Sequence, residues 1–284
     1  MSRNKERLGG TTAPNQEMPA AALDTDSGSG FSFVVPTDMI DLPSKGKFYP
    51  PTHPLHNVDT IELKQMTAKE EDLLTSKTLL KKGVVLDRLL QSLIVDKRIK
   101  PEHLFVGDRN AIVIAIRIAG YGNEYTTSIT CPACNLKQKK TFDLFDYKTH
   151  HGEQSSEIVT NNNDGTFTTT LPKTGLDVTF RLLTGVDEKT LTSGMKQDRQ
   201  RNVHEQNITR QLRSMLVSVA GNNTSQALNY LIENIPSLDS RHLRLAYKTA
   251  APNVELKDTF ICASCDHEQE MEVPLTADFF WPDR

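Results

Sequence analysis

Two short stretches decide the fold: Cys131-Pro132-Ala133-Cys134 and Cys262-Ala263-Ser264-Cys265. They contain the chain's four cysteines, and each has the spacing of a zinc knuckle, a tight turn that points two thiolates at one metal ion. Strand-like runs flank both turns, at residues 125–130 and 137–144 and at residues 258–261 and 269–275. Two knuckles complete a closed, structural four-thiolate site. The sequence therefore predicts a structural Zn²⁺ bound by Cys131, Cys134, Cys262 and Cys265.

A redox role is the main alternative for a Cys-x-x-Cys motif. The chain has 284 residues and a formal net charge of −3, without an apolar run near the ~20 residues that span a bilayer. Residues 1–23 lack the apolar core of a signal peptide, so we expect folding in a reducing cytoplasm. Paired Cys-x-x-Cys motifs favour metal over disulfide there. His151 and His267 are the nearest other donors, and we expect both to be surface histidines.

The sequence before the first knuckle resembles the sequence before the second knuckle. Asp59–Leu63 followed by Met66-Thr67 is similar to Leu176–Phe180 followed by Leu183-Thr184. An offset of 131 residues separates Asp108 from Asp239, and the same offset separates the first cysteines of the two knuckles. Coincidence between amphipathic helices is the alternative explanation. We predict an α+β fold: a duplicated strand–helices–zinc-knuckle unit, closed by a four-cysteine zinc-ribbon-like site, with a disordered N-terminal arm.

Composition changes along the chain predict its division into parts. The first residues are rich in Ser, Gly and Thr and poor in large apolar groups, and several prolines follow them. The predicted parts are a flexible arm at 1–31, an extended Pro-rich strap at 32–56, a first α+β repeat with a knuckle at 57–145, a linker at 146–165, and a second repeat with a knuckle and an aromatic tail at 166–284.

Hydrophobic spacing predicts the elements within the repeats. We expect helices at 84–96, 109–120, 208–219, 227–235 and 239–249, and strands at 57–65, 167–171 and 176–182. Thr67-Ala68-Lys69-Glu70 has the form of a capping box that starts another helix. Asp108 is a candidate N-cap, and Asp41 and Glu70 read as caps or surface charges.

The sequence has no Gly-rich phosphate loop, no His-Glu-x-x-His helix and no nucleophile elbow, so we predict that the protein is not an enzyme. Aromatic residues are the remaining unusual feature, because large rings dominate interface energetics. They lie in the strap and in the tail, where they either pack on their own chain or bind a partner. The candidate partner-binding residues are Phe48, Tyr49, Phe279, Phe280 and Trp281.

Several stretches of the sequence resemble those of a known protein family. Leu42–Gly46 with Tyr49, Met66-Thr67 with Glu70-Glu71, Gly107–Arg109, Tyr121-Gly122 and the first knuckle resemble the T-even-type phage baseplate protein family, as does the closing Phe279–Pro282. The resemblance implies a structural or assembly role in the tail baseplate hub of a contractile-tailed phage. It also implies other baseplate or hub proteins as partners and synthesis in the host cytoplasm, and it fits both a protein that stays in the virion tail and an assembly factor that leaves it.

A zinc-ribbon protein that binds nucleic acid or regulates transcription is the alternative function. The net charge of −3 gives no general attraction to nucleic acid. Three lysines lie near the first knuckle, whereas acidic residues flank the second: Asp266, Glu268, Glu270 and Glu272. We therefore favour the baseplate role and expect no nucleic-acid partner.

Overall fold

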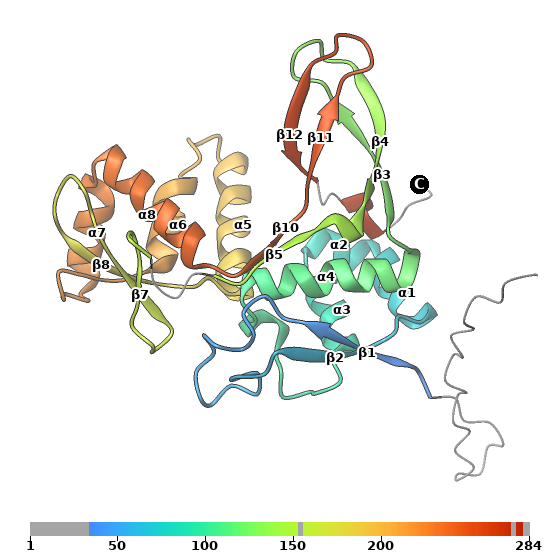
Figure 1. Cartoon of the computed structure of the whole chain (residues 1–284), viewed down its shortest axis with the longest axis horizontal. Coiled ribbons are helices and arrows are strands. Elements are labelled where there is room, and N and C mark those ends of the chain that lie inside the picture. The colour runs from blue at the N-terminus through green and yellow to red at the C-terminus, as the bar shows by residue number, and fades with distance from the viewer. Residues whose placement is uncertain (1–33, 153–155, 274–276, 281–284) are drawn as a thin grey trace, which may run out of the picture. The chain divides into compact units, whose positions relative to one another are not determined.

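The structure is a computed structural model that describes residues 34–152, 156–273 and 277–280 (Figure 1). The chain divides into two units, residues 1–36 and residues 37–284. Only residues 34–36 of the first unit are described, so the predicted arm at 1–31 lies outside the described residues. Everything below concerns the second unit.

From Thr37 to Asp143 the chain forms a strand pair, a set of helices and a hairpin. The elements of this segment are β1 (Thr37–Asp41), β2 (Thr60–Lys64), α1 (Ala68–Thr75), α2 (Lys77–Lys82), α3 (Val85–Leu93), the 3₁₀-helix η1 (Pro101–His103), α4 (Val106–Tyr121), β3 (Glu124–Thr130) and β4 (Lys137–Asp143). Apolar residues of α3 recur at helical spacing, and Val85, Leu89, Leu90 and Leu93 are buried.

The remaining chain has a similar order of strands, helices and a closing hairpin. Its elements are η2 (Leu144–Asp146), β5 (Lys148–His150), β6 (Thr160–Asn161), β7 (Thr166–Thr170), β8 (Asp177–Arg181), α5 (Gly185–Gln200), α6 (Asn207–Met215), β9 (Leu216–Val219), α7 (Ser225–Asn234), α8 (Ser237–Ala250), β10 (Asn253–Glu255), β11 (Lys257–Ile261), β12 (Glu268–Glu272) and η3 (Ala277–Phe280). The fold is therefore a mixed α+β fold, as predicted.

All strand pairs in the described part of the chain are antiparallel. Four two-stranded sheets are formed by β1 with β2, β3 with β4, β5 with β10, and β11 with β12, and one four-stranded sheet has the order β6-β7-β8-β9. The β5–β10 pair joins the chain that leaves the first knuckle to the chain that enters the second, with Asn253 opposite His150. The chain that leaves the first hairpin is therefore held beside the chain that enters the second.

Two similar turns are each tied to the start of a helix by a buried aspartate. The turn Leu42–Gly46 follows β1, and Asp108 Oδ1 of α4 accepts a hydrogen bond from the Ser44 backbone N–H at 2.9 Å. The turn Leu171–Gly175 follows β7, and Asp239 Oδ1 of α8 accepts one from the Lys173 N–H at 2.7 Å. Both turns contain a glycine at φ +68°, a left-handed backbone that favours glycine.

The helices α1 and α5 also begin in the same way. The backbone N–H of Thr67 donates to the Glu70 carboxylate at 3.1 Å, and that of Thr184 donates to Asp187 at 2.9 Å. Each carboxylate sits three residues into its helix, where it satisfies the N-cap donor and favours the helix dipole. Both helix starts therefore use reciprocal capping, which the sequence predicted for the first.

Aromatic and apolar side chains from both segments share one core. The ring of Phe48, in the loop before β2, lies 5.4 Å from the ring of Phe167 on β7, and Phe167 stacks on Phe180 of β8 at 5.7 Å. The loop that follows β1 therefore packs against the second segment.

The structure differs from the predicted elements in four places. The helix expected at 208–219 ends at Met215, because Leu216 turns to an extended conformation and starts β9. Residues 146–165 contain β5 and β6, so they are not a structureless linker. The strand expected at 57–65 is shorter, because β2 begins at Thr60 and Val58 is exposed before it. The N-cap of α4 is Phe105, so Asp108 lies in the first turn of the helix. The finer domain boundaries stay predictions.

Candidate metal centre

The two knuckles have the same backbone geometry. In the first, the Cys131 N–H donates to Leu136 O at 2.8 Å and the Asn135 N–H donates to Cys131 O at 2.9 Å. In the second, the Cys262 N–H donates to His267 O at 2.9 Å and the Asp266 N–H donates to Cys262 O at 3.1 Å. The residue after each second cysteine is left-handed, Asn135 at φ 59° and Asp266 at φ 52°. Asn and Asp tolerate this conformation, so each turn can close tightly.

The structure brings the four cysteines together. Their Sγ atoms all lie within 4.8 Å of one another, with Cys131 Sγ 3.7 Å from Cys265 Sγ and Cys134 Sγ 3.6 Å from Cys262 Sγ. Zn–S bonds of about 2.3 Å in a tetrahedron place the sulfurs about 3.8 Å apart. A disulfide requires about 2.05 Å, and the four cysteines are free. Both of these sulfur pairs join one knuckle to the other, in agreement with a shared metal.

The hairpins β3–β4 and β11–β12 lie side by side (Figure 1), and side chains of the first contact the backbone of the second. Gln138 Nε2 donates to Ile261 O at 2.8 Å, and the Ala263 N–H donates to Gln138 Oε1 at 2.9 Å. Lys140 donates to Thr259 O and forms an ion pair of 2.7 Å with Asp258. The hairpins are therefore held together by protein contacts beside the thiols, so the site is preorganised for a metal.

The surroundings of the thiols differ within each pair. Cys131 and Cys262 are buried, whereas Cys134 and Cys265 are exposed. Backbone N–H groups of Ser264 and Cys265 donate to Cys262 and lower its pKa to about 6. The His267 N–H acts in the same direction on Cys265, but burial and the neighbouring thiols raise the pKa of that group to about 12. The thiolate, which is the form that binds metal, is therefore favoured at Cys262 and disfavoured at Cys265.

The two histidines considered as other donors lie outside the thiol group. The group of possible metal-binding residues found in the described part of the chain consists of the four cysteines. His267 Nε2 lies 3.4 Å from Gln269 Oε1, and His151 Nδ1 lies 2.9 Å from Pro43 O. Four soft sulfur donors suit Zn²⁺, so the residues fit the predicted metal.

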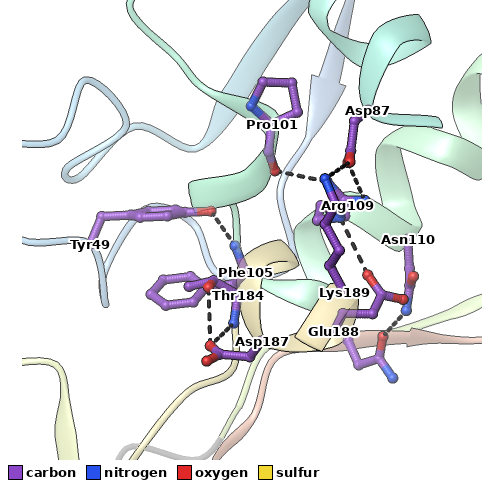
Figure 2. Close-up of polar contacts among 11 residues, drawn as sticks. Tyr49, Asp87, Pro101, Phe105, Arg109, Asn110, Thr184, Asp187, Glu188 and Lys189 are labelled. Atoms are coloured by element: carbon purple, nitrogen blue, oxygen red, sulfur yellow. Dashed lines mark hydrogen bonds and ion pairs between the residues drawn. The ribbon is translucent and has the colours of Figure 1, made fainter. Parts of the chain in front are cut away.

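A second polar cluster joins the two segments of the chain around Arg109 (Figure 2). The buried Arg109 donates through Nη1 to Pro101 O at 2.8 Å, and its Nη2 forms an ion pair with Asp87 at 3.0 Å. Its Nε lies 3.5 Å from Glu188 of α5, while the Val106 N–H donates to Leu183 O at 3.1 Å beside it. Arg109 therefore connects α3, η1 and α4 to the start of α5.

The fully buried Asp108 is held by residues of the loop after β1. Its carboxylate accepts hydrogen bonds from Ser44 N–H at 2.9 Å, Ser44 Oγ at 2.6 Å and Tyr49 Oη at 2.8 Å. Burial raises the pKa of Asp108, and these donors partly oppose it. Burial and the nearby Asp108 carboxylate also raise the pKa of Tyr49. These groups lock the loop to α4, a role that sequence reasoning missed when it treated Asp108 as a cap or a surface charge.

The predicted partner-binding aromatics are buried in this structure, apart from Trp281, which lies outside the described residues. Tyr49 stacks on Phe105 at 4.2 Å, and Phe279 packs edge-on against Tyr125 at 5.2 Å. Phe279 of the tail therefore packs on the first hairpin. A partner could contact these rings only after the loop or the tail moved, so partner binding by Phe48, Tyr49, Phe279 and Phe280 stays a prediction.

Arg117 holds the tail in place and was also missed from the sequence. It is fully buried in α4, and it donates to Phe279 O at 2.7 Å, Gly122 O at 2.7 Å and Glu124 O at 2.9 Å. No sequence signal pairs Arg117 with a carbonyl 162 residues away. For Asp108 and Asp239 a signal was present, since Leu-Pro-x-x-Gly occurs before each at 42–46 and 171–175.

The structure is a mixed α+β protein in which segments far apart in sequence meet at four cysteines with the geometry of a metal-binding site. The chain belongs to the T4 bacteriophage base plate protein family, whose model matches residues 36–281. This match confirms the resemblance seen in the sequence and extends it over most of the chain. No curated protein and no solved structure matches. Among the described residues, no helix combines the length and the apolar character needed to cross a membrane.

Proposed function

We propose that the protein is a non-enzymatic structural or assembly component of the baseplate hub of a contractile-tailed phage, in which a bound Zn²⁺ clasps the fold. The observation that carries this proposal is the family match over residues 36–281. The thiol group supports the metal part, because four sulfurs lie at distances suited to one zinc ion.

The zinc would be structural because four thiolates fill its tetrahedral coordination and leave no position for a substrate or a reactive water. Residues 135–261 separate the two knuckles in sequence. Closing a long loop removes much conformational freedom from the unfolded chain, so a metal at this position would stabilise the whole unit. The proposed clasp therefore serves rigidity, which suits a component of a particle that transmits mechanical force.

We also propose that the two segments arose as a duplicated unit. The matched features are the paired Leu-Pro-x-x-Gly turns with their buried aspartates, the two capped helices and the two knuckles. Backbone angles at the helix starts support the match: Thr67 has φ −118° and ψ 172°, and Thr184 has φ −109° and ψ 174°. Phe105 and Pro236, before α4 and α8, are equally close at −60°, 147° and −58°, 147°.

The proposed partners are other baseplate or hub proteins, met first in the host cytoplasm and then in the virion tail. The acidic exposed residues of β12 give no support to the alternative role in nucleic-acid binding, because phosphates require basic contacts. The predicted arm, loop and aromatic tail remain the candidate sites for partner contacts.

Elemental analysis tests the metal. Protein purified without chelator should contain about one zinc per chain, and Cys134→Ser should lose it. Ala133→Ser is the matched control, because it adds a hydroxyl to the same exposed turn without removing a ligand. A folded wild-type protein free of metal would contradict the zinc proposal and leave the baseplate role open.

Infection tests the baseplate role. In the phage that encodes this chain, disruption of its gene should leave incomplete baseplates, and wild-type protein supplied in trans should restore complete tails. Electron microscopy of tail intermediates separates a hub defect from a later one. Complete, infectious tails assembled without the protein would refute the assignment.

A further inference from the structure

The two knuckle hairpins form a small sandwich with distinct inner and outer faces. Alternation along a strand places successive side chains on opposite faces. Tyr125, Ile129, Phe142 and Phe260 are buried on the inner faces, and Gln138 and Lys140 reach across to β11 from the same side. The residues between them face outward and are exposed.

The two outer faces have opposite charge at the ends nearest the knuckle turns. On the first hairpin, Lys137 and Lys139 of β4 are exposed and pair in register with Thr130 and Ser128 of β3. On the second, Glu268, Glu270 and Glu272 of β12 are exposed in a row. Within the described residues, none of these five side chains forms an ion pair. At the far ends of the two faces the charges are balanced differently: Glu124 and Asp143 pair in register on the first hairpin, and Lys257 lies opposite Glu272 on the second. The excess of basic charge on the first face and of acidic charge on the second therefore lies beside the knuckle turns.

An apolar side chain adds to the acidic face. Ile261 of β11 is 57% exposed and lies directly opposite Glu268 in the strand register. Lys140, by contrast, already pairs with Asp258 across the inner interface. One ion pair between a basic and an acidic side chain therefore already joins the inner faces of the hairpins. The outer faces carry side chains that could form the same type of ion pair.

We propose that the basic outer face of one copy docks on the acidic outer face of a second copy of this chain. Because one module presents both charges on different faces, the contact is heterologous: each copy keeps one free basic and one free acidic face. Such a contact repeats from copy to copy and generates a ring or a filament. This inference goes beyond the baseplate assignment, since it specifies which surface joins the copies.

Strand length limits the strength of the contact. A strand of five residues spans about 17 Å, so a two-stranded face buries much less than the roughly 800 Å² per partner of a stable interface. Exposed charge pairs are also screened as salt increases. The predicted self-association is therefore weak and salt-dependent, and it would act where other baseplate contacts raise the local concentration of copies.

Sedimentation velocity of the zinc-loaded full chain tests the proposal. At about 0.05 M salt and protein up to about 0.5 mM, wild type should form dimers and larger species that dissociate at about 0.5 M salt. Lys137→Glu/Lys139→Glu should abolish association, as should Glu268→Lys/Glu270→Lys. Lys47→Glu/Lys100→Glu is the matched control, because it makes the same charge change at two exposed lysines elsewhere and should still associate.

The mixture of the two charge-reversed variants gives the deciding result. Each variant alone has two faces of like sign and should stay monomeric, whereas their mixture pairs opposite faces again and should recover association. Zinc content and circular dichroism measured on the same samples distinguish an unfolded hairpin or a failed zinc proposal from a failed docking proposal. A wild type that stays monomeric at low salt, or a mixture that stays monomeric, would overturn the inference.

Discussion

The two Leu-Pro-x-x-Gly turns are both bound by a buried aspartate, but the loops that follow them differ in length. In the turn at 171–175, Asp239 accepts the Lys173 and Thr174 N–H groups at 2.7 and 3.1 Å, and β8 begins two residues later. In the turn at 42–46, Asp108 accepts one N–H and two hydroxyls, and the chain continues through residues 47–59 before β2.

The longer loop, at residues 47–59, makes additional contacts that hold it against the rest of the protein. Tyr49 extends the aspartate network and also accepts the Phe105 N–H at 3.0 Å, while Phe48 packs on Phe167 of β7. The comparison teaches that the first turn does more than reverse the chain, because its extension also connects the two segments. The predictions below use paired substitutions at matched positions to test how far the equivalence of the two segments extends.

Removal of a metal ligand should have the largest effect, and it should be equal in the two knuckles. Cys131→Ser and Cys262→Ser each remove a buried thiolate from the same four-ligand set. Loss of a ligand present at a thousandfold excess over its Kd lowers the free energy of unfolding by about 4 kcal/mol. Thermal unfolding with added zinc measures both variants. A large drop for one and none for the other would show that the knuckles do not share one ion.

The two buried aspartates should differ in cost. Asp108→Ala leaves three buried donors without an acceptor, and we expect the free energy of unfolding to fall by about 3–4 kcal/mol. Asp239→Ala leaves two backbone donors, and we expect a fall of about 2–3 kcal/mol. Urea unfolding measures both. Tyr49→Phe removes one of the three donors to Asp108 and should cost about 1 kcal/mol. Equal costs for the two aspartates would mean that the hydroxyl donors contribute nothing.

Local signals made the knuckles, α4 and the β7–β8 hairpin predictable. Each Cys-x-x-Cys turn is complete within a few residues, and the stretch 106–121 has the apolar content of a buried helix. Pairings between distant residues were not predictable. Leu216 and Val219 continue the apolar spacing of α6, yet β9 forms because these residues pair with Phe180 and Val178 of β8. The acceptors of Arg117 are likewise invisible in local sequence, since Phe279 lies 162 residues away.

Arg109 and Ser240 occupy matched positions, one residue after each anchoring aspartate, and should respond differently to substitution. Arg109→Met removes the buried cation that joins Asp87 to the carbonyl of Pro101 (Figure 2), and we expect a loss of about 3 kcal/mol. Ser240→Ala should change stability by no more than about 1 kcal/mol. Chemical denaturation of both variants tests this difference. A neutral Arg109→Met would show that the connection between the segments depends on packing instead of on this cation.

Small effects are expected at the capped starts of α1 and α5. There, the dependence of stability on pH and salt should distinguish the Glu70 carboxylate from the Asp187 carboxylate. Burial raises the pKa of Asp187, but donors from Arg181 and Thr184 outweigh it, so the pKa lies below its ordinary value. The pKa of Glu70 is also lowered, because Ser92 and Thr67 donors outweigh burial. A lowered folded-state pKa stabilises the protein above the unfolded pKa of about 4, and that stability is lost as pH falls through the folded value.

Asp187→Asn and Glu70→Gln should each lower the free energy of unfolding by about 1–2 kcal/mol at pH 7. Their difference from wild type should shrink below about pH 4, when the wild-type carboxylates are protonated as well. Asp187 forms an ion pair with Arg181 Nη2 at 2.7 Å, whereas Glu70 interacts electrostatically with Lys97 without forming an ion pair within the described residues, so high salt should reduce the cost of Asp187→Asn more than that of Glu70→Gln. Urea titrations at two salt concentrations measure this difference. The same salt response for both would mean that the helix starts are equivalent in energy as well as in geometry, and that Arg181 adds only a contact.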